Sequence, residues 1–358
     1  MDSKNNFKVI GLMSGTSLDG LDIAFCNFSK VPSGWRYSIK QATTMKYPLA
    51  WRKKLSSAQD LSGEALIALD MEYGKFLGKA CKTFISENKL KPDFIASHGH
   101  TVFHQPAKGF TYQIGNGNAL HAVCGVPVIY DFRSLDVQLG GEGAPLVPAG
   151  DKLLFSEYDV CLNLGGIANL SMDVKKVRIA YDICFNNMGL NYIMSKIGKA
   201  FDEGGQLAST GTVNASMLSK LNRVYASLRP KRPSLGREIF EQRIQPILDE
   251  PGIKVEDKLS TFVTSSAREI ITAIVSEKKN AKVLCTGGGT FNSFFVSCLL
   301  EQLGDNGALI IPEEEVVKFK EAMVFAFLGV LRVERQPNCF KSVTGADADS
   351  SGGVLVGL

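Results

Sequence analysis

The segment from residue 11 to residue 22 carries side chains suited to binding an anion. It reads Gly-Leu-Met-Ser-Gly-Thr-Ser-Leu-Asp-Gly-Leu-Asp. An apolar run enters this segment and a second one leaves it, which is typical of two strands joined by a tight turn. Such a turn can present backbone N–H groups together with the hydroxyls of Ser14, Thr16 and Ser17. The segment therefore predicts an anion-binding turn, with an ordinary polar hairpin as the alternative.

Two glycines and two aspartates in the same turn refine this prediction. Gly15 and Gly20 allow a ligand to approach the backbone closely and permit positive φ. Asp19 and Asp22 would repel a bare phosphate, so their presence indicates a bridging cation such as Mg²⁺, with Asp19 as the candidate ligand. No Gly-Lys-Ser/Thr follows, so the turn is not a Walker A loop.

Two further glycine turns follow strand-like segments in the second half of the chain. Residues 159–172 repeat the order strand, glycine turn, strand, and a β-type run at 282–285 ends in three glycines before a helical pattern. The glycines of these turns are Gly165, Gly166, Gly287, Gly288 and Gly289. Two similar lobes would bring the first two turns to the phosphates of one nucleotide and the third turn to its nucleoside.

Hydrophobic periodicity supplies the elements that must position these turns. Short β-type runs predict strands at 7–13, 23–28, 35–46, 94–97, 126–131, 159–172, 177–182 and 282–285. Helical spacing of apolar residues predicts helices within 63–89, 186–275, 292–303 and 316–334. The mixture predicts an α/β fold in which compact apolar strands followed by polar loops form partly parallel sheets.

Composition bounds the class of protein. The chain has 358 residues, 45% of them hydrophobic and 21% charged, which is enough for two domains with packed cores. A net charge of +4 is too small to predict a nucleic-acid partner, and the basic, proline-punctuated segment 229–237 favours a solvated loop. Eight scattered cysteines without a Cys-x-x-Cys favour buried free thiols. Without a leader or an apolar run near 18 residues, we expect a cytoplasmic protein with no membrane partner.

Eight motifs are spread along nearly the whole chain. The first is the segment 11–22; the others are Ser97-His-Gly-His-Thr-Val-Phe-His104, Asp131-Phe-Arg133, Gly140-Gly-Glu-Gly-Ala-Pro-Leu-Val-Pro148, Asn163-Leu-Gly-Gly-Ile-Ala-Asn169, Gly236-Arg-Glu238, Gly287-Gly-Gly289 and Val343-Thr-Gly-Ala346. Together they resemble the motifs of the anhydro-N-acetylmuramic acid kinases, a family of the sugar kinase, Hsp70 and actin superfamily. One glycine cluster alone would be a weak signal, whereas eight motifs in the family's order argue strongly against coincidence.

The resemblance implies a fold of two actin-like, ribonuclease H-like lobes. Each lobe would hold a mixed five-stranded sheet flanked by helices, with a nucleotide cleft between the lobes. Residues 1–157 would form the N-terminal lobe, with the first phosphate turn and part of the sugar site. Residues 158–358 would form the C-terminal lobe, and its last helix could cross back to the first. The resemblance also implies a homodimer.

The resemblance implies an unusual reaction as well. The family cleaves the 1,6-anhydro ring of 1,6-anhydro-N-acetylmuramic acid with water and phosphorylates O6 from ATP, with Mg²⁺, during recycling of the bacterial cell wall. Water must attack C1 as O6 leaves, and O6 must attack the γ-phosphorus. One carboxylate beside the water can act as general base. The phosphoryl step then depends mainly on positioning and charge neutralisation.

By the same resemblance, Asp182 is the general base, although an aspartate between a strand and a helix can instead be an N-cap. Arg133 would clamp the lactyl carboxylate of the sugar, with a structural salt bridge as the alternative. His98 and Glu321 would lie near the sugar, and the alternative for Glu321 is a surface charge. A zinc site formed by the clustered histidines is disfavoured, because no acidic or cysteine ligand stands at a fitting spacing.

The chain departs from the family's pattern near the expected sugar site. The family continues Thr-Gly-Pro-Gly-Asn after its catalytic aspartate, whereas this chain has bulkier residues at 183–186. His100 and Glu142 replace glutamines, and Leu235 replaces a threonine. The alternatives are therefore a kinase of the same fold for a different amino sugar, and a catalytically silent sugar- or nucleotide-binding relative.

Overall fold

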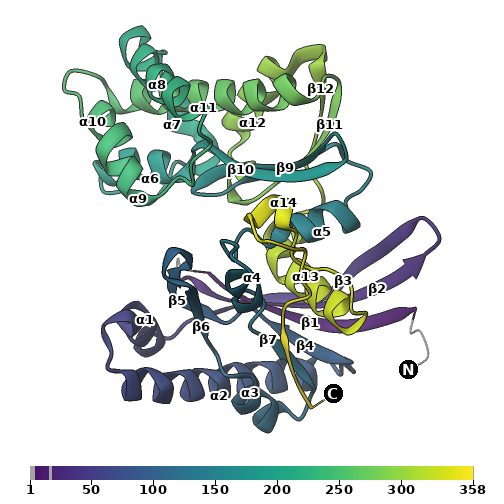
Figure 1. Ribbon diagram of the computed structural model, residues 1–358. Coiled ribbons are helices and arrows are strands. Elements are labelled where there is room, and N and C mark those ends of the chain that lie inside the picture. The colour runs from purple at the N-terminus through teal and green to yellow at the C-terminus, as the bar shows by residue number, and fades with distance from the viewer. Residues whose placement is uncertain (1–4, 16–17, 358) are drawn as a thin grey trace. The chain divides into compact units, whose positions relative to one another are not determined.

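The computed structural model describes residues 5–15 and 18–357, and the chain divides into two units (Figure 1). Unit 1 comprises Met1–Leu154 and Phe319–Leu358, and unit 2 comprises Phe155–Lys318. The C-terminal segment therefore belongs to the unit that the N-terminal segment begins. Within the described part of the chain, no helix has both the length and the apolar character that crossing a membrane would require. All eight cysteines are free, as expected.

Unit 1 contains a six-stranded mixed sheet in the order β13-β7-β4-β1-β2-β3. Its strands are β1 (Asn6–Ser14), β2 (Gly20–Val31), β3 (Gly34–Lys46), β4 (Phe94–Ser97), β7 (Val128–Tyr130) and β13 (Val354–Val356). Strands β5 (His100–Gln105) and β6 (Phe110–Ile114) form a separate two-stranded ribbon. The helices are α1 (Leu49–Ser56), α2 (Gly63–Glu87), α3 (Gly117–Cys124), α4 (Ser134–Gln138), α5 (Val147–Leu154), α13 (Glu314–Val333, from residue 319 onward) and α14 (Lys341–Thr344).

Alternation along β1 allows helices to cover both faces of this sheet. Ile10 and Leu12 belong to the buried cluster that α2 helps to form. Gly11 lies between them in the strand and so faces the other way, toward α13. A Cβ on Gly11 would lie 1.8 Å from the carbonyl oxygen of Ala322, so only glycine lets α13 approach β1 this closely. Packing therefore explains the first glycine of the 11–22 motif.

Unit 2 contains a five-stranded mixed sheet in the order β10-β9-β8-β11-β12. Its strands are β8 (Val160–Leu164), β9 (Ile167–Val174), β10 (Val177–Phe185), β11 (Ala281–Thr286) and β12 (Gly307–Ile310). Its helices are α6 (Asn187–Ser195), α7 (Gln206–Ser209), α8 (Ala215–Leu228), α9 (Arg237–Ile239), α10 (Gln245–Leu248), α11 (Val255–Glu277) and α12 (Ser293–Leu303). The long helix α11 contributes much of the core, because more than half of its residues are buried.

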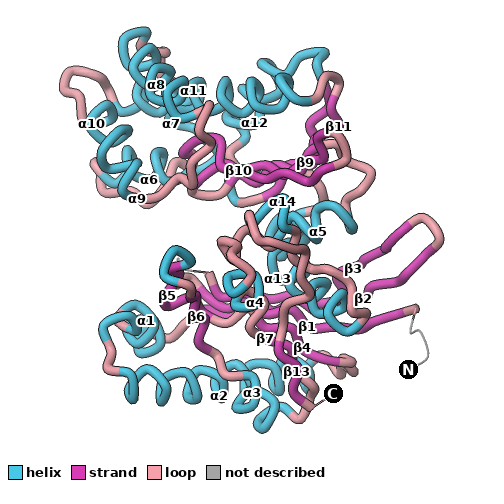
Figure 2. The backbone as a smooth tube through the Cα atoms, in the orientation of Figure 1, coloured by secondary structure: helices cyan, strands magenta, loops and turns pink. Residues whose placement is uncertain are grey.

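The two sheets share one connectivity, and Figure 2 shows their strands in magenta. In each unit three antiparallel strands are followed by two parallel strands, giving the orders β3-β2-β1-β4-β7 and β10-β9-β8-β11-β12. This repeated arrangement confirms the predicted class of two actin-like α/β lobes. Unit 1 departs from the expected five strands, because the C-terminal segment adds β13 antiparallel to β7.

Candidate functional site

The first predicted phosphate turn joins β1 to β2 in unit 1. Thr16 and Ser17 lie outside the described residues. Ser14 is buried, and its hydroxyl accepts a hydrogen bond from the hydroxyl of Tyr47 at 2.8 Å and lies 3.1 Å from Nδ1 of His100. The Ser14 hydroxyl is therefore engaged inside unit 1, contrary to the expectation that it faces an anion.

The glycines of this turn differ from expectation in one respect. Gly20 has no positive φ; instead, a Cβ there would lie 2.7 Å from the carbonyl oxygen of Met45. This glycine therefore permits the close pairing of β2 with β3. Among the described residues of this turn, Leu18 has a positive φ, of 59°. Its N–H donates to the carbonyl oxygen of Gly15 at 3.4 Å. The chain thus reverses here through a left-handed residue that is not a glycine.

The two aspartates of the turn have different surroundings. Asp22 accepts a hydrogen bond from Oγ1 of Thr44 at 2.5 Å, and burial raises the pKa of Asp22, with the nearby Asp19 acting in the same direction. Asp19 itself is exposed. Among the described residues, no three His, Cys, Asp or Glu side chains are grouped to hold a metal ion. A cation at Asp19 would therefore take most of its ligands from phosphate oxygens and water, as Mg²⁺ commonly does.

The second and third glycine turns come together inside unit 2. A Cβ on Gly287, whose φ is 89°, would lie 2.5 Å from Oδ1 of Asn163. A Cβ on Gly289 would lie 2.7 Å from Cβ of Leu164. The third turn therefore packs on the end of β8, immediately before the second turn begins at Gly165. Packing alone requires glycine at 287 and 289.

Gly166 and Gly288 have no such packing requirement. The nearest atom to an added Cβ lies 3.9 Å away in both cases, on Met188 and Asn187 respectively. Neither glycine has a positive φ. A glycine that the fold itself does not need can serve the close approach of a ligand to the backbone. These two positions are the best candidates in unit 2 for contact with a nucleotide.

Asp182 lies within β10, at an irregularity in its pairing with β9. Its Oδ2 accepts a hydrogen bond from the backbone N–H of Leu235 at 2.9 Å. Helix α6 begins at Asn187, with Asn186 in the N-cap position. The structure therefore excludes the alternative in which Asp182 is an N-cap. It also places Asp182 three residues before the strand ends rather than at its last position.

The bulky residues that follow Asp182 mostly enter the core. The bulge makes Cys184, Phe185 and Asn186 consecutively buried, and the ring of Phe185 packs edge-on against that of Phe240, with centroids 5.3 Å apart. Only Ile183 of this segment lines the pocket that contains Asp182. The departure from the family's glycines therefore adds volume chiefly to the interior of unit 2.

Asp182 lies in a pocket of about 70 Å³ within unit 2. Other residues that line the pocket include Tyr181, Ile183, Arg229, Arg232, Leu235 and Glu269. Burial raises the pKa of Asp182, while the N–H of Leu235 lowers it. Oδ1 has no hydrogen-bond partner among the described residues. A carboxylate with one oxygen fixed, one oxygen free and increased basicity is suited to accept a proton from water.

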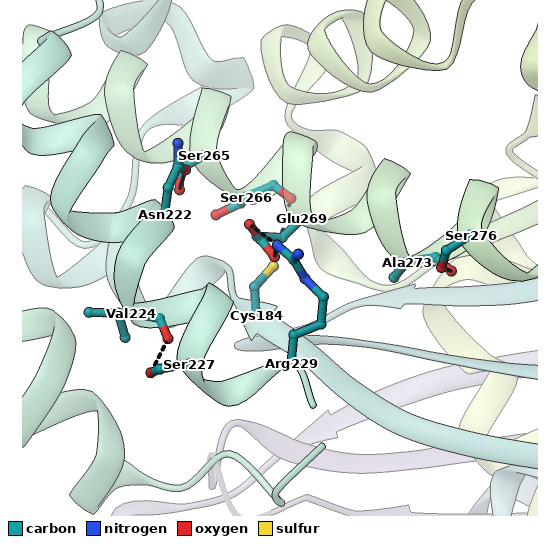
Figure 3. A network of polar contacts seen from close by, with 10 residues as sticks. All are labelled: Cys184, Asn222, Val224, Ser227, Arg229, Ser265, Ser266, Glu269, Ala273 and Ser276. Atoms are coloured by element: carbon teal, nitrogen blue, oxygen red, sulfur yellow. Dashed lines mark hydrogen bonds and ion pairs between the residues drawn. The ribbon is translucent and has the colours of Figure 1, made fainter. Parts of the chain in front are cut away.

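Two ion pairs fasten the loop that contains Leu235. The Nη2 atom of Arg229 lies 3.0 and 2.8 Å from the carboxylate oxygens of Glu269, which is 4% exposed (Figure 3). Nη2 of Arg232 lies 2.7 Å from Oε1 of Glu277, and its guanidinium lies 4.0 Å from the ring centroid of Tyr181. The basic segment expected as a solvated loop is thus tied to α11 and β10. Sequence reasoning missed these partners, because the ion-pair partners stand 40 and 45 residues apart with no motif to link them.

In unit 1, His98 and Arg133 form a direct contact. Nε2 of His98 accepts from Nε of Arg133 at 3.1 Å and from Nη2 at 3.0 Å, and Nδ1 lies 2.9 Å from the carbonyl oxygen of Gly99. A guanidinium only donates, so Nδ1 must carry the proton. Burial and the charge of Arg133 hold the pKa of His98 well below its usual range. His98 is therefore a neutral acceptor whose two ring nitrogens already have partners.

Arg133 keeps part of its hydrogen-bonding capacity free. Nη1 donates to the carbonyl oxygen of Gly143 at 2.7 Å, and the guanidinium lies 5.9 Å from the ring centroid of Phe325. No carboxylate among the described residues lies within ion-pair distance of Arg133. Burial lowers the pKa of Arg133 to about 10, and the negative charge of Glu321 acts in the opposite direction. The guanidinium of Arg133 is therefore a cation with N–H groups still available to a ligand.

Glu321 is exposed on α13, one turn before Phe325, whose ring centroid lies 4.7 Å from that of His98 and 5.9 Å from the guanidinium of Arg133. The structure thus brings together the three residues that the resemblance assigned to the sugar, namely His98, Arg133 and Glu321, within unit 1. Their roles differ, because His98 is buried with partners on both ring nitrogens and can act on a ligand only by holding Arg133.

Comparison with known proteins identifies the family of this chain. The family model described as anhydro-N-acetylmuramic acid kinase matches residues 7–357. Curated proteins with this name include one from Sulfurimonas denitrificans, 32% identical over 97% of this chain and 98% of its own length. Those from Shewanella denitrificans and Haemophilus influenzae are 34% and 32% identical, over 94% and 97% of this chain and 95% and 97% of their own lengths.

Solved structures resemble the chain more distantly. The activator of the 2-hydroxyisocaproyl-CoA dehydratase from Clostridium difficile, with bound ADPNP, matches with a TM-score of 0.42 and 14% identity, over 92% of this chain and 97% of that chain. The family model and the curated proteins show the family, because the family model matches residues 7–357 and the curated matches cover nearly the full length of both this chain and the relatives. This chain belongs to the anhydro-N-acetylmuramic acid kinase family.

Proposed function

We propose that this chain opens the 1,6-anhydro ring of 1,6-anhydro-N-acetylmuramic acid with water and transfers the γ-phosphoryl group of ATP to O6. The products are N-acetylmuramic acid 6-phosphate and ADP. The observation that carries the proposal is the state of Asp182: one oxygen is held by Leu235 and the other is free in a small pocket. Family membership supports the substrate.

Asp182 accounts for the first half of this reaction. A water proton passes to the free Oδ1 of Asp182 as the water oxygen bonds to C1, and the bond between C1 and O6 breaks. The released O6 then bonds to the γ-phosphorus, and the bond from that phosphorus to the β,γ-bridging oxygen breaks. Burial raises the pKa of Asp182, which strengthens the carboxylate as a base.

Arg133 accounts for recognition of the sugar. Its free N–H groups suit the lactyl carboxylate, because a planar guanidinium can bind a carboxylate through two parallel hydrogen bonds. His98 and the carbonyl of Gly143 hold the guanidinium in place from the other side. We assign Glu321, on α13 one turn before the Phe325 ring that contacts this guanidinium, to the same sugar. A kinase for an amino sugar without an acidic substituent would not need this guanidinium.

The glycine turns account for the nucleotide. Gly166 and Gly288, where an added Cβ would meet no atom closer than 3.9 Å, allow phosphate or nucleoside to approach the backbone. Mg²⁺ bound to the phosphates would neutralise charge during transfer. The exposed Asp19 would be a ligand of the ion, and replacing Asp19 by asparagine should raise the Mg²⁺ concentration needed for half-maximal activity. We also expect a homodimer, which light scattering after size exclusion would show.

The two alternatives make different predictions for one product assay. The purified chain is incubated with Mg-ATP and each of four sugars: the anhydro sugar, its analogue without the lactyl group, N-acetylmuramic acid and N-acetylglucosamine. Mass spectrometry and ³¹P NMR should find a 6-phosphate with an open C1 hydroxyl from the first sugar, formed fastest. Faster phosphorylation of another sugar would favour a different substrate. No phosphorylated sugar at all would mean a silent relative.

A further inference from the structure

We propose that Arg232 is a positioning residue for Asp182: it fastens the loop between α8 and α9 to β10 and α11, so that the N–H of Leu235 meets the carboxylate. The inference rests on the proposed role of Asp182 as general base. Arg232 touches neither the reacting atoms nor the carboxylate, and it acts through the backbone of its own loop.

The loop leaves α8 by a tight turn. The N–H groups of Lys231 and Arg232 both donate to the carbonyl of Leu228, at 3.0 and 3.1 Å. Arg232 adopts a φ of 42°, in the left-handed region that is unfavourable for its side chain type. Three residues later Leu235 is buried, at 5% exposure, in the core of unit 2. The position of the Leu235 N–H therefore depends on how this short loop is held.

Arg232 holds the loop against two different elements. Its Nη2 is paired with Glu277, near the end of α11, at 2.7 Å. Its guanidinium also lies 4.0 Å from the ring centroid of Tyr181, a distance typical of a cation–π contact. Tyr181 immediately precedes Asp182 in β10. The same loop therefore contacts two consecutive residues of the strand, one through the Arg232 side chain and the other through the Leu235 backbone.

A second tie keeps the start of the loop in place. Arg229 binds both carboxylate oxygens of Glu269, which is almost fully buried on α11 beside the same pocket (Figure 3). Removing Arg229 would leave a buried carboxylate without its partner, which is strongly destabilising. Arg232 is the better probe of positioning, since 40% of its side chain and 24% of that of Glu277 are exposed.

The consequence for Asp182 is both geometric and electrostatic. The N–H of Leu235 fixes Oδ2, whereas Oδ1 has no hydrogen-bond partner among the described residues, and the side chain lines the pocket. The charged groups that line this pocket beside Asp182 are Arg229, Arg232 and Glu269. If the loop is released, the carboxylate loses both its fixed orientation and the donor that lowers its pKa. The pKa of Asp182 should then rise, and fewer molecules should hold the carboxylate in the productive orientation.

The test compares Arg232→Ala with the wild type by two measurements. The first is the pKa of Asp182, from a pH titration of its ¹³Cγ NMR signal, which is assigned by its loss in Asp182→Asn. We expect an increase of about half a unit or more in Arg232→Ala. The second is steady-state kinetics on the anhydro sugar. We expect kcat to fall about tenfold, with the KM for Mg-ATP unchanged within about twofold, and the acid limb of the kcat profile to move to higher pH.

Arg223→Ala is the matched control, because Arg223 is exposed on α8 and its hydrogen bond is to Oγ of Ser219 at 3.4 Å. It should leave both measurements unchanged. Glu277→Gln weakens the ion pair between Arg232 and Glu277 from the side of α11. It should change the pKa of Asp182 and kcat in the same direction as Arg232→Ala, so the test remains decisive if Arg232→Ala does not fold. If Arg232→Ala or Glu277→Gln folds and keeps both the wild-type pKa of Asp182 and the wild-type kcat, the proposal is wrong. If the wild type phosphorylates no sugar, the proposed function fails, while the titration still decides the positioning role.

Discussion

Nε2 of His98 accepts hydrogen bonds from two nitrogens of Arg133, at 3.1 and 3.0 Å. Because the other ring nitrogen lies 2.9 Å from the carbonyl oxygen of Gly99, the imidazole is fixed as a neutral acceptor and the plane of the guanidinium is fixed with it. An arginine that is held in this way loses little freedom when it binds a carboxylate. The two residues, 35 positions apart, therefore act as one recognition element.

Replacement of Arg133 tests recognition of the lactyl group. Arg133→Ala should raise the KM for the anhydro sugar by roughly 10- to 100-fold, since a hydrogen bond to a charged group contributes about 1.5–3 kcal/mol. The analogue without the lactyl group should lose much less. His98→Ala should move the KM for the lactyl sugar in the same direction by a smaller factor. Equal losses for the two sugars would mean that Arg133 does not bind the lactyl carboxylate.

Replacement of the unpacked glycines tests contact with the nucleotide. Gly166→Ala and Gly288→Ala should fold with nearly wild-type stability, because an added Cβ meets nothing closer than 3.9 Å. Both should weaken binding of Mg-ATP and reduce the increase in melting temperature that it causes. Isothermal titration calorimetry gives the affinities directly. Wild-type affinity in both variants would show that the nucleotide does not approach these positions.

Gly11 tests the contact between β1 and α13. Gly11→Ala would bring a Cβ to 1.8 Å from a backbone oxygen, which a side-chain rotation cannot relieve. We expect the free energy of unfolding to fall by about 3 kcal/mol in urea denaturation. Gly63→Ala is the control, because Gly63 opens α2 with no atom within 4 Å of an added Cβ, and alanine there should be neutral or slightly stabilising. Similar stability of the two variants would contradict this packing.

His100 should make the stability of the protein depend on pH. Burial lowers the pKa of His100 to about 4, whereas the unfolded chain has the ordinary value of 6.5. The unfolded state therefore binds more protons between these values, and stability falls as the pH is lowered. From pH 6.5, where half of the unfolded chains carry a protonated His100, to pH 5, the loss from His100 alone is about 1.6 kcal/mol. His100→Gln should remove this share. An unchanged pH dependence in that variant would show that His100 is not buried in its neutral form.

The motifs predicted the fold class well because the fold class depends on local pattern. Hydrophobic periodicity predicted most strands and the long helices but missed the short strands β5, β6, β12 and β13. The repeated strand–glycine–strand order indicated two similar lobes. The purpose of each glycine was not predictable, because it depends on atoms far away in the sequence. Gly11 and Gly20 belong to the predicted turn, yet they are required by Ala322 and Met45.

The hydrogen-bond and ion-pair partners of the site residues also could not be predicted from the sequence. Asp182 was identified through the resemblance, but the donor that orients it is a backbone N–H 53 residues later. A backbone donor leaves no signature in the side chain, and Leu235 by itself suggested only a lost hydroxyl. The roles of Arg229 and Arg232 depend on acidic partners on α11, so a basic loop with prolines gave no sign of them.

The central claim is that Asp182 removes a proton from the attacking water, and turnover of Asp182→Asn tests it most directly. Asparagine keeps an oxygen for the N–H of Leu235 but cannot accept the proton at neutral pH. We expect kcat on the anhydro sugar to fall by about 10⁴-fold, the upper end of the range for a general base, with the affinity for Mg-ATP and the melting temperature nearly unchanged. Asp305→Asn, at an exposed position in unit 2, is the control and should behave as wild type. If folded Asp182→Asn retains more than about a tenth of wild-type turnover, Asp182 is not the general base and the proposed mechanism is wrong.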